Sequence, residues 1–355
     1  MSKSITSTLS SSFIKAEATR LGFTACGIAN ARTVEPKVQE AYERWIASGH
    51  QAQMAYMNRN LDLRYHPDLL LPGCRTIISL ALDYTPTERI APDHPQIAFY
   101  VYGPDYHDVM KARIRELAKA IFKSSEHSDY SEYSESSPSG NFEGGRFRVA
   151  VDTAPMLERY WAEKSGIGWI GRHRNLIVPG CGSFVFLGEL LLTTDVDQYD
   201  SPIPNRCGTC HRCIDACPTG ALSQSSESNK LEEASFDARR CLSYLTIEHR
   251  GPFTPEQAGI VRNQPTPRYI YGCDRCQLAC PHNNRVYKAN TPYKSHDTNT
   301  PFQASPRLTS MTATDWATLT REQYQELFRG SAVKRAKYEG LMRNIETICP
   351  LNESK

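Results

Sequence analysis

Two stretches of sequence decide the fold of this chain: Cys207-Gly-Thr-Cys210-His-Arg-Cys213-Ile-Asp-Ala-Cys217-Pro218 and Cys273-Asp-Arg-Cys276-Gln-Leu-Ala-Cys280-Pro281. The first has the bacterial ferredoxin spacing, in which three thiolates bind one [4Fe–4S] cluster and the fourth reaches another. Two such clusters need about eight thiolates, and Cys241, between the two runs, is the natural eighth. We expect one cluster on Cys207, Cys210, Cys213 and Cys280 and the other on Cys217, Cys241, Cys273 and Cys276.

Two other uses of cysteine compete with this interpretation. Structural zinc usually takes two C-x2-C pairs separated by a spacer, which does not explain the added cysteine and proline that end each run. Disulfides need an oxidising compartment. The N-terminus lacks the apolar segment of a signal peptide, and no apolar run approaches the roughly 18 residues of a membrane span. We therefore expect a cytoplasmic, monomeric protein without membrane association.

The length and the alternation of elements predict an α+β protein. A chain of 355 residues is expected to form two or three domains. Expected strands are Phe23–Ile28, Thr76–Leu82, Arg148–Val151 and Phe184–Leu192, and expected helices lie within 12–30 and at 37–60, Val109–Phe122 and Leu157–Ser165. Strands and helices alternate up to about residue 195, which is typical of an α/β or α+β sheet domain.

Domain limits follow from these patterns. We predict a sheet domain at 1–195 with a surface insertion at 124–145, a ferredoxin-like module at 196–300 and a short helical segment at 301–355. A second polar stretch at 223–235 separates Cys217 from Cys241. The net charge of +2 does not by itself indicate nucleic-acid binding.

Two segments near residue 160 need separate interpretation. Gly166-Ile-Gly168-Trp-Ile-Gly171 follows an expected helix instead of opening one, so we interpret it as a glycine-rich C-cap and loop, not as a dinucleotide fingerprint. Asp152 ends an apolar strand, where desolvation would raise its pKa and suit it to donate a proton. It could equally be the N-cap of the helix that follows.

The chain resembles the epoxyqueuosine reductases, the cobalamin- and iron–sulfur-dependent enzymes of tRNA queuosine synthesis. The resemblance runs from about residue 12 to 345 and includes both cysteine runs. Further matching segments are Met54–Met57, Tyr102–His107, Val151–Pro155, Lys164–Gly171, Gly182–Glu189, Cys241–Thr246 and Gly330–Asn344.

This resemblance implies a reaction and its cofactors. A base-off cobalamin would sit between the sheet domain and the cluster module, and two [4Fe–4S] clusters would reduce it to cob(I)alamin. The epoxide of epoxyqueuosine, at the wobble position of tRNA, would be reduced to the alkene of queuosine. The family assigns the proton donor to the aspartate that matches Asp152, so the resemblance favours catalysis over capping there.

The resemblance also implies binding residues and partners. The cobalamin contacts carried over are Arg59, Tyr106, His107, Asp152, Leu176, Leu187 and Asp274. Candidate tRNA contacts are the basic residues Arg240, Arg250, Lys334, Arg335 and Lys337, which would hold phosphates around the anticodon stem-loop. A low-potential donor such as a flavodoxin or ferredoxin would supply electrons.

Two other classes remain open from the sequence. One is a different corrinoid and iron–sulfur reductase, such as a reductive dehalogenase. The other is a ferredoxin-type electron-transfer protein whose N-terminal domain serves only for docking.

Overall fold

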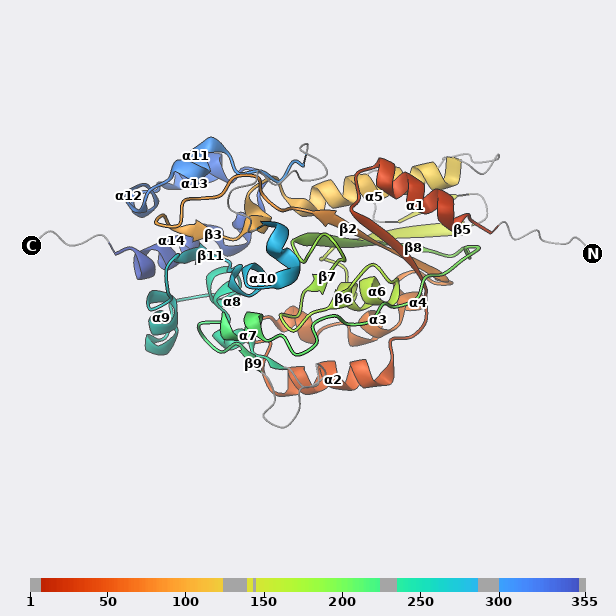
Figure 1. Cartoon of the computed structure of the whole chain (residues 1–355), viewed down its shortest axis with the longest axis horizontal. Coiled ribbons are helices and arrows are strands. Elements are labelled where there is room, and N and C mark those ends of the chain that lie inside the picture. Colours follow the sequence, from red (N-terminus) through yellow and green to blue (C-terminus); the bar gives the residue numbers. More distant parts are fainter. Residues whose placement is uncertain (1–7, 124–138, 143–144, 224–234, 287–299, 351–355) are drawn as a thin grey trace, which may run out of the picture.

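The computed structural model of this chain describes residues 8–123, 139–142, 145–223, 235–286 and 300–350. An antiparallel sheet with its covering helices lies toward one end of the molecule, and a group of short helices lies toward the other (Figure 1). The two polar stretches expected at 124–145 and 223–235 fall largely outside the described residues. Where the first is described, it contributes a strand at Ser139–Phe142 that pairs with the next strand, so this part is not a plain surface loop.

The main sheet has five strands in the order β1-β2-β8-β5-β4. Their bounds are Ala25–Asn30 (β1), Thr76–Asp83 (β2), Val185–Leu192 (β8), Gly145–Ala150 (β5) and Ser139–Phe142 (β4). Every neighbouring pair is antiparallel. The four expected strands are therefore confirmed with shifts of a few residues at their ends, and the antiparallel pairing confirms the α+β class over α/β.

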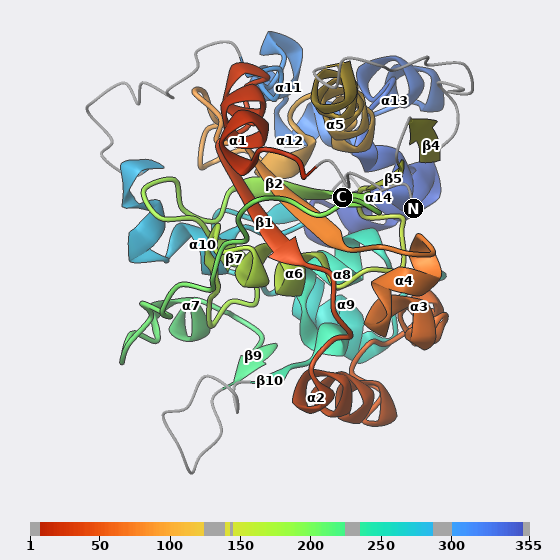
Figure 2. The same cartoon turned by 90° about the vertical axis from the view of Figure 1, so that its right-hand side faces the viewer.

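Helices cover both faces of this sheet (Figure 2). The covering helices are α1 (Ser11–Arg20), α5 (Tyr106–Lys123) and α6 (Glu158–Lys164). α1 packs on β1 and α5 on β8 and β5, while α6 packs on β2 and β8 from the other side. A Cβ added at Gly188 of β8 would lie 2.7 Å from Ile114 Cδ1, so the missing side chain allows α5 to pack directly on the strand.

The helix expected at 37–60 is wrong in its second half. Helix α2 spans Pro36–Ala47, and Gly49 then takes a left-handed backbone with φ +68°. Glycine adopts this conformation without steric cost and commonly ends helices. A short 3-10 turn, η1 (Ala55–Asn58), follows. The C-cap expected after α6 is confirmed, since Gly166 has φ +74°.

The second half of the chain consists of short elements. They are α7 (Arg212–Asp215), β9 (Leu222–Ser223), β10 (Ser235–Phe236), η4 (Ala238–Arg240), α8 (Leu242–Ile247), α9 (Pro255–Arg262), β11 (Tyr269–Tyr271), α10 (Arg275–Leu278) and η5 (Pro281–Val286). After residue 300 come α11 (Pro306–Ser310), α12 (Ala313–Ala317), α13 (Arg321–Leu327), η6 (Ala332–Ala336) and α14 (Lys337–Ile348). This confirms the expected helical C-terminal segment.

The two halves share structure across the predicted domain limits. Strand β3 (Gln96–Ile97) pairs in parallel with β11, although the two are far apart in sequence. Helix α14 packs against α8, α9 and β11. One apolar core runs from Ile14 to Ile348. The limits near residues 195 and 300 remain predictions. In the described part of the chain, no helix has both the length and the apolar character needed to cross a bilayer.

Candidate functional site

Asp152 lies just beyond the end of β5, in a segment that leads to α6. Its backbone is left-handed, with φ +52°, and its side chain is 57% exposed. A left-handed conformation at a residue other than glycine costs of order 1–3 kcal/mol and persists only when the surroundings hold it. Helix α6 begins at Glu158 with Leu157 as its N-cap, so the alternative role of Asp152 as a helix cap is wrong.

His107, in the first turn of α5, connects two carboxylates. Its Nδ1 lies 2.6 Å from Asp105 Oδ1 and its Nε2 lies 2.9 Å from Asp152 Oδ2. Burial alone would lower the pKa of His107, but the hydrogen bonds to Asp105 and Asp152 outweigh it and raise the pKa to about 9. The imidazole is therefore protonated at neutral pH, and both ring nitrogens donate.

The same contacts reverse the expected shift at Asp152. Burial by itself would raise the pKa of this carboxyl, as the sequence suggested, but the hydrogen bond and charge of His107 lower it below its ordinary value, helped by the Tyr106 hydroxyl and Arg335. The pKa of Asp105 is also lowered, chiefly by its hydrogen bond to His107. At neutral pH the shared proton therefore resides on His107, and Asp152 is a carboxylate.

Tyr106 fixes the position of this group against the sheet. Its ring stacks on Phe186 of β8 at 4.4 Å with a 2° interplanar angle and on His107 at 4.0 Å. Burial, followed by the charge of Asp152, raises the pKa of Tyr106 above its usual range, so the hydroxyl keeps its proton. Three predicted site residues, Tyr106, His107 and Asp152, are thus brought together.

Two glutamates near Asp152, Glu158 and Glu189, have raised pKa values. The Asp152 backbone N–H donates to Glu158 Oε1, and burial followed by the charge of Asp152 raises the pKa of Glu158 to about 8. Glu189 is 0% exposed on β8, opposite Ala150 of β5, and burial raises its pKa well above the usual range. Neither carboxylate oxygen of Glu189 has a hydrogen-bond partner among the described residues. A carboxyl group in this environment is expected to be neutral.

The other predicted cobalamin contacts are more scattered. Leu176 and Leu187 belong to one apolar cluster beneath the sheet. Arg59 is exposed after η1. Asp274 is buried, its Oδ2 accepts the Phe99 N–H at 2.8 Å, and burial raises its pKa to about 7. The structure thus gives Asp274 a backbone-binding role.

Several buried polar atoms in this half of the molecule have no hydrogen-bond partner among the described residues. Besides the Glu189 oxygens, they include Trp169 Nε1 and His173 Nε2. Burial, then the Arg159 charge, lowers the pKa of His173 to about 4, so its ring is neutral. Leaving a buried polar group unpaired costs roughly 1–3 kcal/mol. Hydrogen-bonding partners from a bound ligand, such as the amide side chains of a corrinoid, would remove this cost.

The structure brings the two cysteine runs together. Helices α7 and α10, one from each run, are in contact. Burial first, then the thiols of Cys280, Cys207 and Cys210, raise the pKa of Cys213 to about 11, and these four are the residues expected on the first cluster. In the other set, burial and then Cys273, Cys241, Cys213 and Cys217 raise the pKa of Cys276.

These neighbouring cysteines belong to the expected sets, except that Cys213 of the first set also acts on Cys276; which cysteines bind which cluster stays a prediction. Among the described residues, no three His, Cys, Asp or Glu side chains form a group suited to a single metal ion. A [4Fe–4S] cluster distributes its four thiolates over four irons.

The basic residues predicted to contact tRNA fall in two places. Arg335 forms a two-pronged ion pair with Glu248, at 2.8 Å for each nitrogen, and lies 5.5 Å from the Tyr56 ring centre. Arg250 Nη2 donates to the Arg335 carbonyl at 2.9 Å. Lys334 and Lys337 are exposed nearby on the chain. This group lies close enough to Asp152 for the Arg335 charge to lower its pKa.

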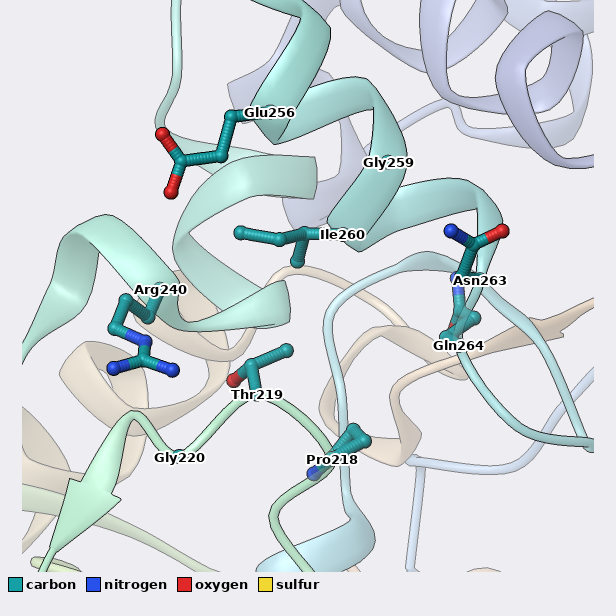
Figure 3. Close-up of a pocket in the computed structure, with 9 residues that line it drawn as sticks. All are labelled: Pro218, Thr219, Gly220, Arg240, Glu256, Gly259, Ile260, Asn263 and Gln264. Carbon is teal, nitrogen blue, oxygen red and sulfur yellow. The ribbon is translucent and has the colours of Figure 1, made fainter.

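Arg240 lies elsewhere, at the opposite end of α8 from Glu248. It borders a hollow of about 670 Å³ between α9 and the loop after α7 (Figure 3). The lining residues are Pro218, Thr219, Gly220, Arg240, Glu256, Gly259, Ile260, Asn263 and Gln264. The loop directly follows Cys217, and Ile260 points from α9 toward Thr219. No residue predicted to bind cobalamin lines this hollow.

Sequence reasoning missed three residues of the site. Asp105 stood inside a recognised segment, and its spacing of two from His107 was the available signal. Glu189 was detectable as a single charge within an apolar strand. Glu158 offered no local signal, because its role depends on where the segment after Asp152 turns back.

Comparisons with known proteins agree over nearly the whole chain. The family model described as "Epoxyqueuosine reductase QueG, DUF1730" matches residues 64–153, and the model "4Fe-4S double cluster binding domain" matches residues 206–283. The chain is 37% identical over 338 residues to an epoxyqueuosine reductase of Cellulophaga algicola, covering 95% of this chain and 97% of the relative. Its identity to an epoxyqueuosine reductase of Gloeobacter violaceus is 37% over 334 residues, covering 93% of each.

A solved structure shows the same fold. The epoxyqueuosine reductase of Streptococcus thermophilus superposes with a TM-score of 0.73 at 26% identity, covering 94% of this chain and 79% of that one. The second matched family model spans all eight cysteines predicted to bind the two clusters.

Proposed function

The chain belongs to the epoxyqueuosine reductase family, and we propose that it reduces the epoxide of epoxyqueuosine at the wobble position of tRNA to queuosine. It is an oxidoreductase with a double [4Fe–4S] domain. The relatives named above are all epoxyqueuosine reductases, which favours this activity over dehalogenation or simple electron carriage.

The chain's residues are suited to hold the cofactors. The two cysteine sets would bind one cluster each, and Tyr106, His107, Asp152, Leu176 and Leu187 would contact a corrinoid, with Arg59 at its edge. When bound, cobalamin would supply a strongly nucleophilic reduced cobalt for epoxide opening, using electrons that the clusters pass on. Asp274 would support the site indirectly, through the backbone of Phe99.

The proton supply follows from the geometry around His107. Removing an epoxide oxygen as water and leaving an alkene consumes two electrons and two protons. His107 holds one proton at neutral pH and shares it with Asp152 across 2.9 Å. Asp152, a carboxylate at neutral pH, would first take the His107 proton and pass it to the epoxide oxygen, and solvent would return a proton to His107 for the second transfer. This hydrogen bond between a protonated imidazole and an exposed carboxylate is the observation that carries the proposal.

The tRNA and the electron donor would use separate surfaces. Arg335, Arg250, Lys334 and Lys337 lie on the Asp152 side and would contact phosphates of the anticodon stem-loop. Arg240 would contact further phosphates of the same stem-loop or belong to a second tRNA-binding surface. A flavodoxin or ferredoxin would deliver electrons to the clusters, and a monomer in the cytoplasm, where tRNA is modified, is the expected setting.

The decisive experiment is reconstitution with iron, sulfide and cobalamin without oxygen, followed by turnover on epoxyqueuosine-bearing tRNA with a low-potential reductant. Mass spectrometry of the nucleosides should show the loss of one oxygen, dependent on cobalamin. Iron and cobalt bound without this mass change would overturn the proposed substrate and leave the cofactors in place.

A further inference from the structure

We propose that Glu158 is a positioning residue, whose side chain holds Asp152 in its left-handed conformation and thereby places the Asp152 carboxylate on His107. The proposal rests on the proposed role of Asp152 and adds the group that maintains it. Glu158 would touch neither substrate nor cofactor in this role.

The backbone geometry shows that Asp152 needs such support. An aspartate with φ +52° is in a sparsely populated conformation, and its side chain is more than half exposed, so packing does not enforce it. The segment from Asp152 to Leu157 forms no helix or strand. Its internal hydrogen bonds, Thr153 N–H to Val151 O and Met156 N–H to Ala154 O, shape the turn without involving Asp152.

Glu158 supplies the missing contact. It is the first residue of α6, a helix that packs on the sheet, so its side chain starts from a fixed element. Its Oε1 accepts the Asp152 N–H, which is the only hydrogen bond made by the Asp152 backbone N–H in the described structure. The Glu158 carboxyl is thus directed at the Asp152 backbone, and the N-cap Leu157 makes no side-chain capping bond to the helix.

The protonation state of Glu158 matters for this contact, because burial and then the charge of Asp152 raise its pKa to about 8. The buried carboxyl of Glu189 stands on β8 opposite Ala150 of β5, and burial, followed by the interaction with Glu158, raises the pKa of Glu189. A neutral Glu158 accepts the N–H through its carbonyl oxygen without adding a second negative charge beside Asp152. An amide at position 158 would present the same carbonyl, which makes Glu158→Gln a conservative replacement.

The test uses the cofactor-free protein and reads the pKa of His107 by NMR titration of its ring signals. His107 reports on Asp152 because their hydrogen bond helps raise its pKa from 6.5 to about 9. Asp152→Asn sets the value expected when that carboxylate is lost. Glu158→Ala and Glu158→Met should lower the His107 pKa nearly as much as Asp152→Asn does, by at least about one unit, which is a tenfold loss of proton affinity. In Glu158→Gln the His107 pKa should stay near the wild-type value.

Glu163 provides a matched control from the same helix. Its Oε1 also accepts a backbone N–H from another segment, that of Ile170, at 2.9 Å. Glu163→Ala should leave the His107 pKa unchanged. Glu158→Met preserves the side-chain volume, so the test can still be made if the alanine variant does not fold. Near-UV circular dichroism spectra identify the variants that are folded.

Two results would overturn the inference: an unchanged His107 pKa in folded Glu158→Met, or an equal fall in Glu158→Gln and Glu158→Met. In the reconstituted enzyme, Glu158→Met should lower kcat with little change in the KM for tRNA. If Asp152→Asn proves fully active, the proposed function of Asp152 fails, yet the NMR result still decides whether Glu158 positions it.

Discussion

The cysteine runs and the Asp152 site place their functional groups by opposite means. Seven of the eight cysteines lie in short-range spacings around the small helices α7 and α10, and a metal cluster would fix their final arrangement. The Asp152 site joins the start of α5, the end of β5 and the start of α6 through hydrogen bonds that form without any cofactor. Ligand spacing can therefore be recognised in sequence, whereas a proton-transfer site must be assembled by the fold.

The largest expected effect comes from removing one of the predicted cluster ligands. Cys241→Ser should remove the second cluster, because Cys241 is the only predicted ligand outside the two runs. Iron should fall from about eight to about four atoms per chain, and turnover should be lost. Iron and sulfide analysis with electron paramagnetic resonance measures this. Cys349→Ser, outside both sets, is the control, and full iron content in Cys241→Ser would exclude Cys241 as a ligand.

Asp152→Asn should abolish proton transfer at the Asp152 site without disturbing the clusters. It keeps the shape of the side chain but removes the proton-transfer group, so kcat should fall by about 10²–10⁴-fold. Iron content and the tRNA dissociation constant should match wild type. Turnover assays and filter binding on the same preparation provide the comparison, and an active Asp152→Asn enzyme would remove this residue from the reaction.

A smaller effect, about 10²-fold at most, is expected from His107→Gln, because water can partly replace a residue that reprotonates Asp152. The wild-type rate should decline as the pH rises through about 9, where His107 loses its proton, and this limb should disappear in the variant. A pH–rate profile measures both. Retention of the alkaline limb in His107→Gln would assign it to another group.

The same pair predicts a pH-dependent stability. The folded pKa of His107 lies above its ordinary value of 6.5, so its contribution is fully present below about 6.5 and is lost as the pH rises through about 9. The difference in Tm between wild type and His107→Gln should therefore be largest at pH 6 and vanish near pH 10. A difference that grows with pH would contradict the assigned protonation state.

The smallest effect concerns the basic residues. Arg335→Ala should weaken tRNA binding by about tenfold. It should also reduce the slope of log K for tRNA binding against log salt concentration by about one. Arg240→Ala, at the other end of α8, should weaken it less. Binding titrations at several salt concentrations measure both, with Arg20→Ala, a surface residue of α1 paired with Glu17, as the control. An equal loss in Arg240→Ala would extend the tRNA surface to the hollow beside Cys217.

The sequence predicted what local pattern determines. Apolar runs located β2 and β8, and the cysteine spacing predicted that the two runs act together, as the contact between α7 and α10 shows they can. The end of α2 could have been read from Ser48-Gly49, a common C-terminal pair of helices.

Other properties depended on tertiary contacts. His107 and Asp152 are 45 residues apart in sequence, and only the packing of α5 on β5 brings them together. The sign of the Asp152 pKa shift was wrong for the same reason, because an isolated strand end suggests desolvation while the fold supplies a cationic partner. The pairing of β3 with β11 was equally beyond local pattern.

The pairing of β3 with β11 has a consequence for synthesis of the chain on the ribosome. Gln96 and Ile97 leave the ribosome long before Tyr269, and translation at about 5–20 residues per second makes the delay on the order of ten seconds. Phe302, which packs at 4.7 Å against Phe186 of β8, arrives later still. During that interval the part of the sheet half that these later residues cover in the folded protein stays uncovered.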